Sequence, residues 1–173
     1  MDKILDRAVS IAIIIVSIVF LGVVTQKHWT AKKGSSAFAA EVPLGKKLDL
    51  PDINWEANGH TIVLALQKSC HFCNESAPFY KKLSQEISGR QNVSIVAVLP
   101  DTVENSREHL KKLELPIEDV REARLKSVKI SATPALFVVD KTGTVVAGWI
   151  GKLSPDEESE VLEALVQLSE DKR

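Results

Sequence analysis

Cysteine is scarce in this chain, which has two in 173 residues. That scarcity excludes a disulfide-dense secreted mini-protein and a zinc ribbon with four cysteine ligands. An excess of either charge is also absent, because 22 Lys and Arg against 23 Asp and Glu leave a formal net charge of −1. A chain without a basic excess is not expected to bind nucleic acid. Apolar residues at 45% and charged residues at 26% further exclude a disordered, collagen-like or low-complexity chain.

A long hydrophobic run lies near the N-terminus, where the 19 residues from 8 to 26 carry no charge. As a helix rising about 1.5 Å per residue, this run would cover roughly 28 Å, close to the ~30 Å hydrocarbon thickness of a bilayer. The alternative is a cleaved signal peptide, whose apolar region spans about 7–15 residues and ends just before a small-x-small site. The nearby site of that kind, Ala37-Phe38-Ala39, lies well beyond the run. We therefore predict an N-terminal membrane anchor over residues 1–26, formed by one transmembrane helix.

A spacer and a globular part follow the predicted anchor. Residues 27–43 are rich in lysine and small residues, including Gly34-Ser35-Ser36, as is typical of a linker. Residues 44–173 are enough for one hydrophobic core, and we predict a single domain there. The cations on the two sides of the anchor are too evenly divided to set its orientation by the positive-inside rule.

The globular part alternates between two hydrophobic patterns. Short continuous apolar runs rich in β-branched residues indicate buried strands, and apolar residues three or four positions apart indicate helices. The predicted elements are strands over Thr61–Leu66, Val93–Leu99, Ala135–Val139 and Thr144–Trp149, a helix from Cys70 to about Gly89, helices over Val103–Leu113 and Ile117–Val128, a hairpin turn over 140–143, and a last helix beginning with the capping box of Ser154 and Glu157. This order predicts an α/β domain with a mixed sheet covered by helices on both faces.

The sequence Cys70-His71-Phe72-Cys73 lies where the first buried strand passes into a helix. Two residues between cysteines at a helix start allow the sulfurs to approach to disulfide distance. Backbone N–H groups and the helix dipole would stabilise a thiolate at Cys70, which predicts Cys70 as the nucleophile and Cys73 as the resolving thiol. His71 would add positive charge beside that thiolate or point to solvent, and Ser69 would cap the helix. An inert pair of buried thiols or a static disulfide is the alternative interpretation.

Further motifs follow in a fixed order along residues 44–173. They are the lead-in from Leu44-Gly45 to Asn58-Gly59-His60, the strand and C-x-x-C, Pro78, Thr133-Pro134, the 140–143 hairpin and Gly151. With the anchor, this set resembles the membrane-anchored TlpA/ResA-like group of thioredoxin-fold thiol-disulfide oxidoreductases. The resemblance implies a thioredoxin-like mixed β-sheet flanked by helices, preceded by one N-terminal transmembrane helix. It also implies a redox-active disulfide between Cys70 and Cys73 and no other cofactor.

The resemblance extends to substrate binding, partners and location. It implies that Pro134 is cis and faces the C-x-x-C, and that Thr133 offers backbone hydrogen bonds to a bound substrate chain. It implies exchange with protein thiols and disulfides, apocytochromes among them, in the direction of a reductase supplied by a membrane electron donor. It places the soluble domain of a single-pass membrane protein on the extracytoplasmic, periplasmic side.

The chain departs from that group at the residues expected to accept a proton from Cys73. Leu64 stands where thioredoxins have a buried Asp, and Ser76 stands where the TlpA/ResA-like group often has a Glu. Glu75 is the nearest carboxylate in sequence. It would tune the site, together with His71, if the helix turned it inward, although a solvated surface position is favoured.

Other functions remain open at this point. A copper carrier would use the two cysteines and a distant histidine, since soft thiolates select Cu(I). Such carriers typically space their cysteines by three residues, and His60 and His109 are expected on the surface, so we predict no metal site. A thiol peroxidase would need a Thr-x-x-Cys pattern, which residues 66–70 lack. A non-catalytic interaction domain with a structural disulfide is the remaining alternative.

Overall fold

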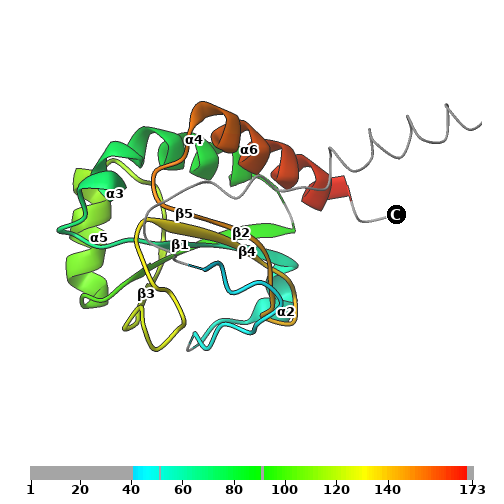
Figure 1. Ribbon diagram of the computed structural model, residues 1–173, viewed down its shortest axis with the longest axis horizontal. Helices are drawn as coiled ribbons and strands as arrows, with labels where there is room; N and C mark the ends of the chain where they lie inside the picture. The colour runs from blue at the N-terminus through cyan, green and yellow to red at the C-terminus, as the bar shows by residue number, and fades with distance from the viewer. Residues whose placement is uncertain (1–40, 51, 91, 171–173) are drawn as a thin grey trace, which may run out of the picture. The chain divides into compact units, whose positions relative to one another are not determined.

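The computed structural model describes residues 41–50, 52–90 and 92–170. In chain order its elements are α2 (Trp55–Asn58), β1 (His60–Ala65), α3 (His71–Glu75), α4 (Ala77–Ile87), β2 (Val93–Leu99), α5 (Val103–Lys112), β3 (Asp119–Glu122), β4 (Ala135–Val139), β5 (Val145–Ile150) and α6 (Pro155–Glu170) (Figure 1). The predicted anchor and most of the predicted spacer lie outside the described residues. Within the described ranges, no helix is both long and apolar enough to cross a membrane.

The strands form one mixed sheet in the order β3-β2-β1-β4-β5. β1 and β2 run parallel, with His60 opposite Val93 and Ala65 opposite Val98. β3 is parallel to β2, whereas β4 is antiparallel to β1 and β5 is antiparallel to β4. This arrangement confirms the predicted α/β class, and it puts β1, which leads into the C-x-x-C, beside β4, which follows Thr133-Pro134.

The central strand β1 is buried on both faces, as its unbroken apolar run predicts. Ile62 and Leu64 point into a core cluster shared with α4 and α6, which lie over one face of the sheet (Figure 1). Val63 and Ala65 point into a second cluster on the opposite face. All four side chains are 0% exposed. The sheet therefore has a core on each side, and packing on both faces holds β1 firmly in place just before the C-x-x-C sequence of Cys70 and Cys73.

The predicted helix over Ile117–Val128 is wrong, because this segment contains β3 instead. β3 pairs in parallel with β2, from Val96 opposite Asp119 to Leu99 opposite Glu122. The pairing satisfies backbone groups along the edge of β2 and buries Val120 to 4% exposure. Tertiary pairing thus outweighs the local helical pattern.

The hairpin turn and the last helix form as predicted. Oδ1 of Asp140 accepts hydrogen bonds from the N–H of Thr142 at 2.8 Å, its hydroxyl at 2.7 Å, and the N–H of Thr144 at 3.0 Å. Partial burial acts to raise the pKa of Asp140, but these hydrogen bonds outweigh it and leave the pKa below its usual value of 3.8. At α6, the Glu157 carboxylate accepts from the Ser154 N–H at 2.8 Å, which completes the capping box.

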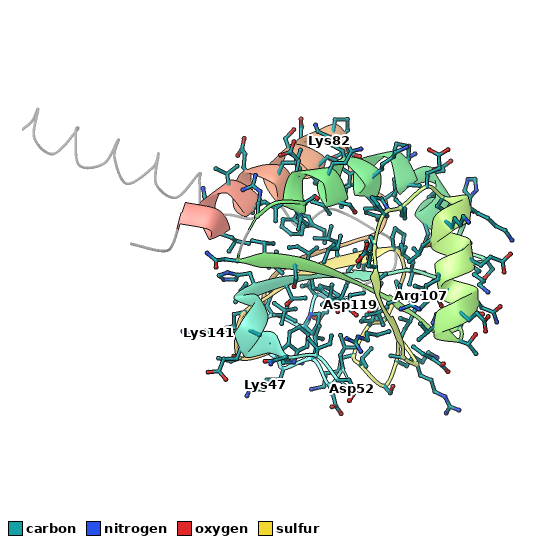
Figure 2. The ribbon with its side chains drawn as sticks, turned by 180° about the vertical axis from the view of Figure 1, so that it is seen from behind. Lys47, Asp52, Lys82, Arg107, Asp119 and Lys141 are labelled. Carbon is teal, nitrogen blue, oxygen red and sulfur yellow. A yellow bond between two sulfur atoms is a disulfide. The ribbon has the colours of Figure 1, made fainter. Side chains whose placement is uncertain are left out.

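The segment that leads into the domain runs along the outer edge of β5. The N–H of Gly45 donates to the carbonyl of Val145 at 2.9 Å, and the N–H of Val145 donates to the carbonyl of Lys46 at 3.0 Å. Figure 2 shows the exposed side chains of Lys47 and Lys141 at this same end of the fold. Residues 41–50 therefore pair with the hairpin and with the start of the last strand.

Candidate functional site: the Cys70–Cys73 disulfide

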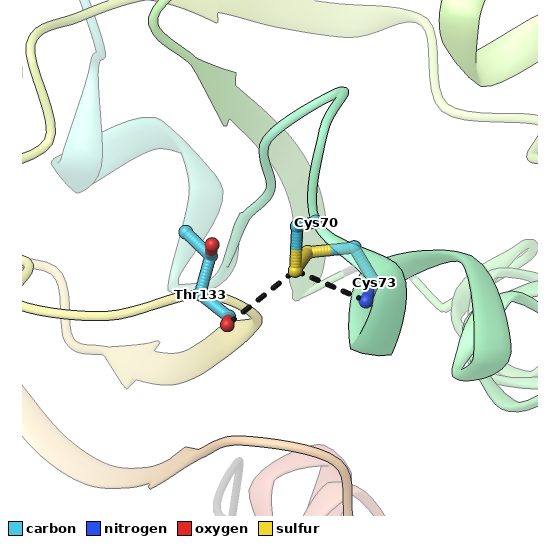
Figure 3. The surroundings of a disulfide bond; sticks show 3 residues. All are labelled: Cys70, Cys73 and Thr133. Atoms are coloured by element: carbon cyan, nitrogen blue, oxygen red, sulfur yellow. Dashed lines mark hydrogen bonds between the residues drawn. A yellow bond between two sulfur atoms is a disulfide. The ribbon is translucent and has the colours of Figure 1, made fainter. Parts of the chain in front are cut away.

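The reactive sequence, Cys70-His71-Phe72-Cys73, follows the loop over residues 66–69 that leads from β1 to α3. The N-cap of α3 is Cys70, with extended backbone angles, and its Sγ accepts a hydrogen bond from the N–H of Cys73 at 3.1 Å (Figure 3). The predicted cap at Ser69 is therefore wrong by one residue. The sulfur takes the place that a serine or aspartate oxygen usually fills at a helix start, so backbone N–H polarity is directed at Cys70.

Cys70 and Cys73 are joined as a disulfide, with their Cα atoms 5.2 Å apart. The two cysteines differ sharply in exposure. Cys73 is 0% exposed within the core cluster under α4, whereas Cys70 is partly exposed at the edge of that cluster. An attacking thiol from another molecule can therefore approach the Cys70 sulfur and not the Cys73 sulfur.

Thr133-Pro134 faces the disulfide from the entrance to β4. The Thr133–Pro134 peptide bond is cis, as the resemblance implied. The Thr133 carbonyl oxygen lies 3.5 Å from the Sγ of Cys70 (Figure 3). On the other side, the carbonyl of Pro134 accepts a hydrogen bond from the N–H of Gly151 at 2.7 Å. The structure thus brings together Cys70, Thr133 and the turn after β5, although they are far apart in the sequence.

His71, Glu75 and Lys152 form a row of polar contacts on the exposed side of α3. Nε2 of His71 lies 3.0 Å from Oε1 of Glu75, and Nζ of Lys152 donates to Oε2 of the same carboxylate at 2.8 Å. The hydrogen bond from Lys152 holds the pKa of Glu75 below its usual value of 4.5; slight desolvation opposes this, and the charges of Lys152 and His71 support it. The Glu75 side chain is 36% exposed and lies at the surface. The sequence gives no signal for Lys152, since 77 residues separate it from Glu75 and no local pattern links them.

The two positions that lack an expected carboxylate are both buried. Leu64 is 0% exposed and Ser76 is 5% exposed. Among the described residues, the Ser76 hydroxyl makes no hydrogen bond within 3.5 Å, although it lies near enough to the buried Tyr80 hydroxyl to interact with it. Ser76 also separates α3 from α4, and Pro78 falls in the first turn of α4, where its missing N–H costs little.

Phe72 projects from the middle of the reactive sequence. Its side chain is 54% exposed, and its ring lies 5.7 Å from that of His71, measured between centroids. The ring therefore contributes little to the core, and a single exposed ring of this kind is common on protein surfaces. Within the described ranges, no group of three or more His, Cys, Asp and Glu side chains is placed to hold a metal ion.

The fold and the disulfide define the class: a thioredoxin-like domain with a C-x-x-C disulfide at the start of a helix. Solved structures share this fold. A putative thiol:disulfide interchange protein DsbE from Chlorobium tepidum is 16% identical, with a TM-score of 0.53 over 66% of this chain and 82% of its own. StoA from Bacillus subtilis is 15% identical, with a TM-score of 0.51 over 70% of this chain and 96% of its own. No curated protein matches the sequence.

The family follows from the sequence. The model of the AhpC/TSA family matches residues 34–147, which is more than half of the chain. The chain therefore belongs to the AhpC/TSA family. The prediction of a thioredoxin-like oxidoreductase enzyme agrees with this family, with the fold and with the disulfide at Cys70 and Cys73.

Proposed function

We propose that this protein is a membrane-anchored thiol-disulfide oxidoreductase of the TlpA/ResA-like kind, which exchanges disulfides with partner proteins through Cys70-His71-Phe72-Cys73 and acts as a reductase. The observation that carries the proposal is the disulfide between a partly exposed, helix-capping Cys70 and a fully buried Cys73. One sulfur meets the partner, and the other can react only within the molecule.

The reaction then takes place in two exchanges. In the reduced protein, the Cys70 thiolate receives the hydrogen bond from the Cys73 N–H and attacks one sulfur of a partner disulfide, releasing the other as a thiolate that takes up a proton. A mixed disulfide on Cys70 results. Cys73 loses its proton and attacks the Cys70 sulfur, so the Cys70–Cys73 bond forms and the second partner sulfur leaves as a thiol. The partner gains two electrons, and a membrane dithiol donor returns them to this protein.

Thr133 and Pro134 are the proposed contacts for the partner chain. The Thr133 carbonyl lies 3.5 Å from the attacked sulfur, so an extended segment bound to the Thr133 backbone would hold its own cysteine against Cys70. His71 is the proposed tuning residue, because it is the first residue of the helical turn that begins at Cys70. A tuning role for Glu75 required an inward position, and its carboxylate lies at the surface beside His71 and Lys152.

The remaining part of the proposal concerns location and partners. An anchor over residues 1–26, a spacer over 27–43 and a domain over 44–173 would hold the site on the extracytoplasmic side, where apocytochromes are candidate substrates. The uncharged run over residues 8–26 supports the anchor. Labelling of Cys70 in intact cells with a membrane-impermeant maleimide tests this location. Labelling only after lysis would contradict it.

The reduction potential of the Cys70–Cys73 pair tests the function. The full-length chain is equilibrated in glutathione buffers, and the oxidised fraction is measured by thiol trapping. A potential near or below about −270 mV is expected for a reductase, whereas one between about −120 and −180 mV would indicate an oxidase or isomerase. If no reversible disulfide forms, the proposed exchange is wrong.

Thiol peroxidase activity is the second candidate, favoured by the match to the AhpC/TSA family. Against it, Gln67 and not threonine stands three residues before Cys70. Peroxide consumption by the reduced chain separates the two functions. Rapid consumption that is lost in Cys70→Ser would favour the peroxidase, and slow consumption beside fast reduction of protein disulfides would favour the exchange reaction.

A further inference from the structure

The start of α3 contacts Thr133 through Cys70, and a second connection links the end of α3 to the turn after β5. Lys152 follows directly after Gly151, whose N–H donates to the Pro134 carbonyl at 2.7 Å. Lys152 then reaches back to Glu75, the last residue of α3, at 2.8 Å. The two sides of the site are thus joined twice: at the contact between Cys70 and Thr133, and at the ion pair between Glu75 and Lys152.

The position of the short helix α3 depends on contacts with neighbouring segments, because few of its own side chains are buried. It has five residues, of which Cys73 is the buried one, and Ser76 separates it from the longer α4. In the oxidised protein, the disulfide ties the N-cap to this buried residue. When the disulfide is reduced that covalent tie is lost, whereas the ion pair at the other end of α3 remains.

We propose that Lys152 is a positioning residue. Its ion pair with Glu75 holds α3 against the hydrogen-bonded backbone of Pro134 and Gly151, and so fixes the surface on which a partner chain lies. This inference rests on the proposed function. Lys152 acts through Glu75 on the spacing between Cys70 and Thr133, and it does not touch the reacting sulfurs. Its contribution is greatest in the reduced state, when the disulfide no longer helps to hold the helix.

The expected effect is modest, because both partners are partly exposed. The Lys152 side chain is 49% exposed and the Glu75 side chain is 36% exposed. Exposed ion pairs of this kind change equilibria by up to about five-fold. Loss of the pair is therefore expected to lower kcat/KM for a protein disulfide by about two- to five-fold.

The test compares four variants of the full-length chain in mild detergent, with insulin disulfides as the substrate. Lys152→Met and Glu75→Gln each remove the pair, and the double variant Lys152→Glu with Glu75→Lys reverses it. Lys81→Met is the matched control, because Lys81 forms an ion pair between α4 and Glu114, and neither residue belongs to the site. Initial rates are measured over a range of pH and at low and high salt, together with thermal unfolding midpoints.

If Lys152 positions α3, both single substitutions lower kcat/KM, the reversed pair restores it, and the control leaves it unchanged. High salt should lower the wild-type rate toward that of the single variants, and the midpoint of the pH profile should stay in place. If Lys152→Met and Glu75→Gln change the rate in opposite directions, or shift the pH midpoint, the residues act through charge alone and positioning is refuted. An active wild type with an unchanged Lys152→Met variant also refutes it. An inactive wild type instead refutes the proposed function.

Discussion

Reduction and alkylation of the two cysteines give the most direct test of the site geometry. The Cys70 sulfur is partly exposed and accepts the Cys73 N–H at 3.1 Å, whereas Cys73 is 0% exposed. After reduction by dithiothreitol and its removal, iodoacetamide should therefore react almost entirely at Cys70. The same arrangement should make Cys70 react faster than an ordinary thiol below neutral pH, where little thiolate is otherwise present.

The expected difference in alkylation rate between Cys70 and Cys73 follows from two contributions. A hydrogen bond to a charged acceptor is worth about 1.5–3 kcal/mol, which corresponds to about 10- to 150-fold more thiolate at Cys70 than at an unassisted thiol. Cys73 reacts only after local opening of the core beneath α4, and an opening free energy of about 3 kcal/mol slows it by roughly 150-fold. The rates at the two sulfurs should therefore differ by at least about 100-fold.

Mass spectrometry of the peptides after timed quenching measures both rates in one sample. The same chain in high urea is the control, since both cysteines should then react at similar rates. If Cys73 reacts within ten-fold of Cys70 in the folded protein, about the factor that 1.4 kcal/mol produces, the division into an attacking and a resolving sulfur is wrong.

Three further predictions concern stability and are measured by urea unfolding. Gly59→Ala should destabilise the fold by about 1–3 kcal/mol more than Gly45→Ala. The two glycines have similar φ angles, +67° and +70°, but of the two only Gly59 would place a Cβ 2.7 Å from a backbone oxygen. Equal losses of stability would contradict this. Ser76→Ala should leave the protein about 1 kcal/mol more stable than Ser84→Ala, since the Ser84 hydroxyl has a backbone partner at 2.9 Å; the reverse order would mean that Ser76 has one too. Because the pKa of Asp140 is lowered in the folded state, its stabilising effect should be present above pH 3.8 and lost as pH falls through the folded pKa. Asp140→Asn should flatten this acid dependence, and an unchanged slope would refute it.

Much of the fold could be predicted because local signals and tertiary packing agree. The strands over Val93–Leu99 and Ala135–Val139 have the predicted bounds, since each is a continuous apolar run placed where both faces are covered. The start of α6 was equally clear, because Ser154 and Glu157 satisfy the first backbone groups by local contacts alone. The cysteine pair followed from its place between strand and helix.

The errors and omissions involve contacts between distant parts of the chain. β3 exists because the edge of β2 is available to it, which no window around Val120 reveals. The cap at Cys70 in place of Ser69 is the local exception, because a sulfur and not a hydroxyl accepts the N–H of Cys73. The link from Lys152 to Glu75 depends on the register that brings β5 beside β4 and so sets the turn after it near α3.

The two edges of the sheet determine how this domain can meet other chains. An uncovered edge strand presents free N–H and C=O groups, and a second copy can pair with them and begin aggregation. Here Gly45 and Lys46 pair with Val145 at the start of that edge. The opposite edge is β3, which is four residues long and carries the ion pair of Arg121 with Asp119 at 2.8 Å. One edge is therefore paired at its start with the chain itself, and the other is short and charged, so both edges offer little backbone to a second copy.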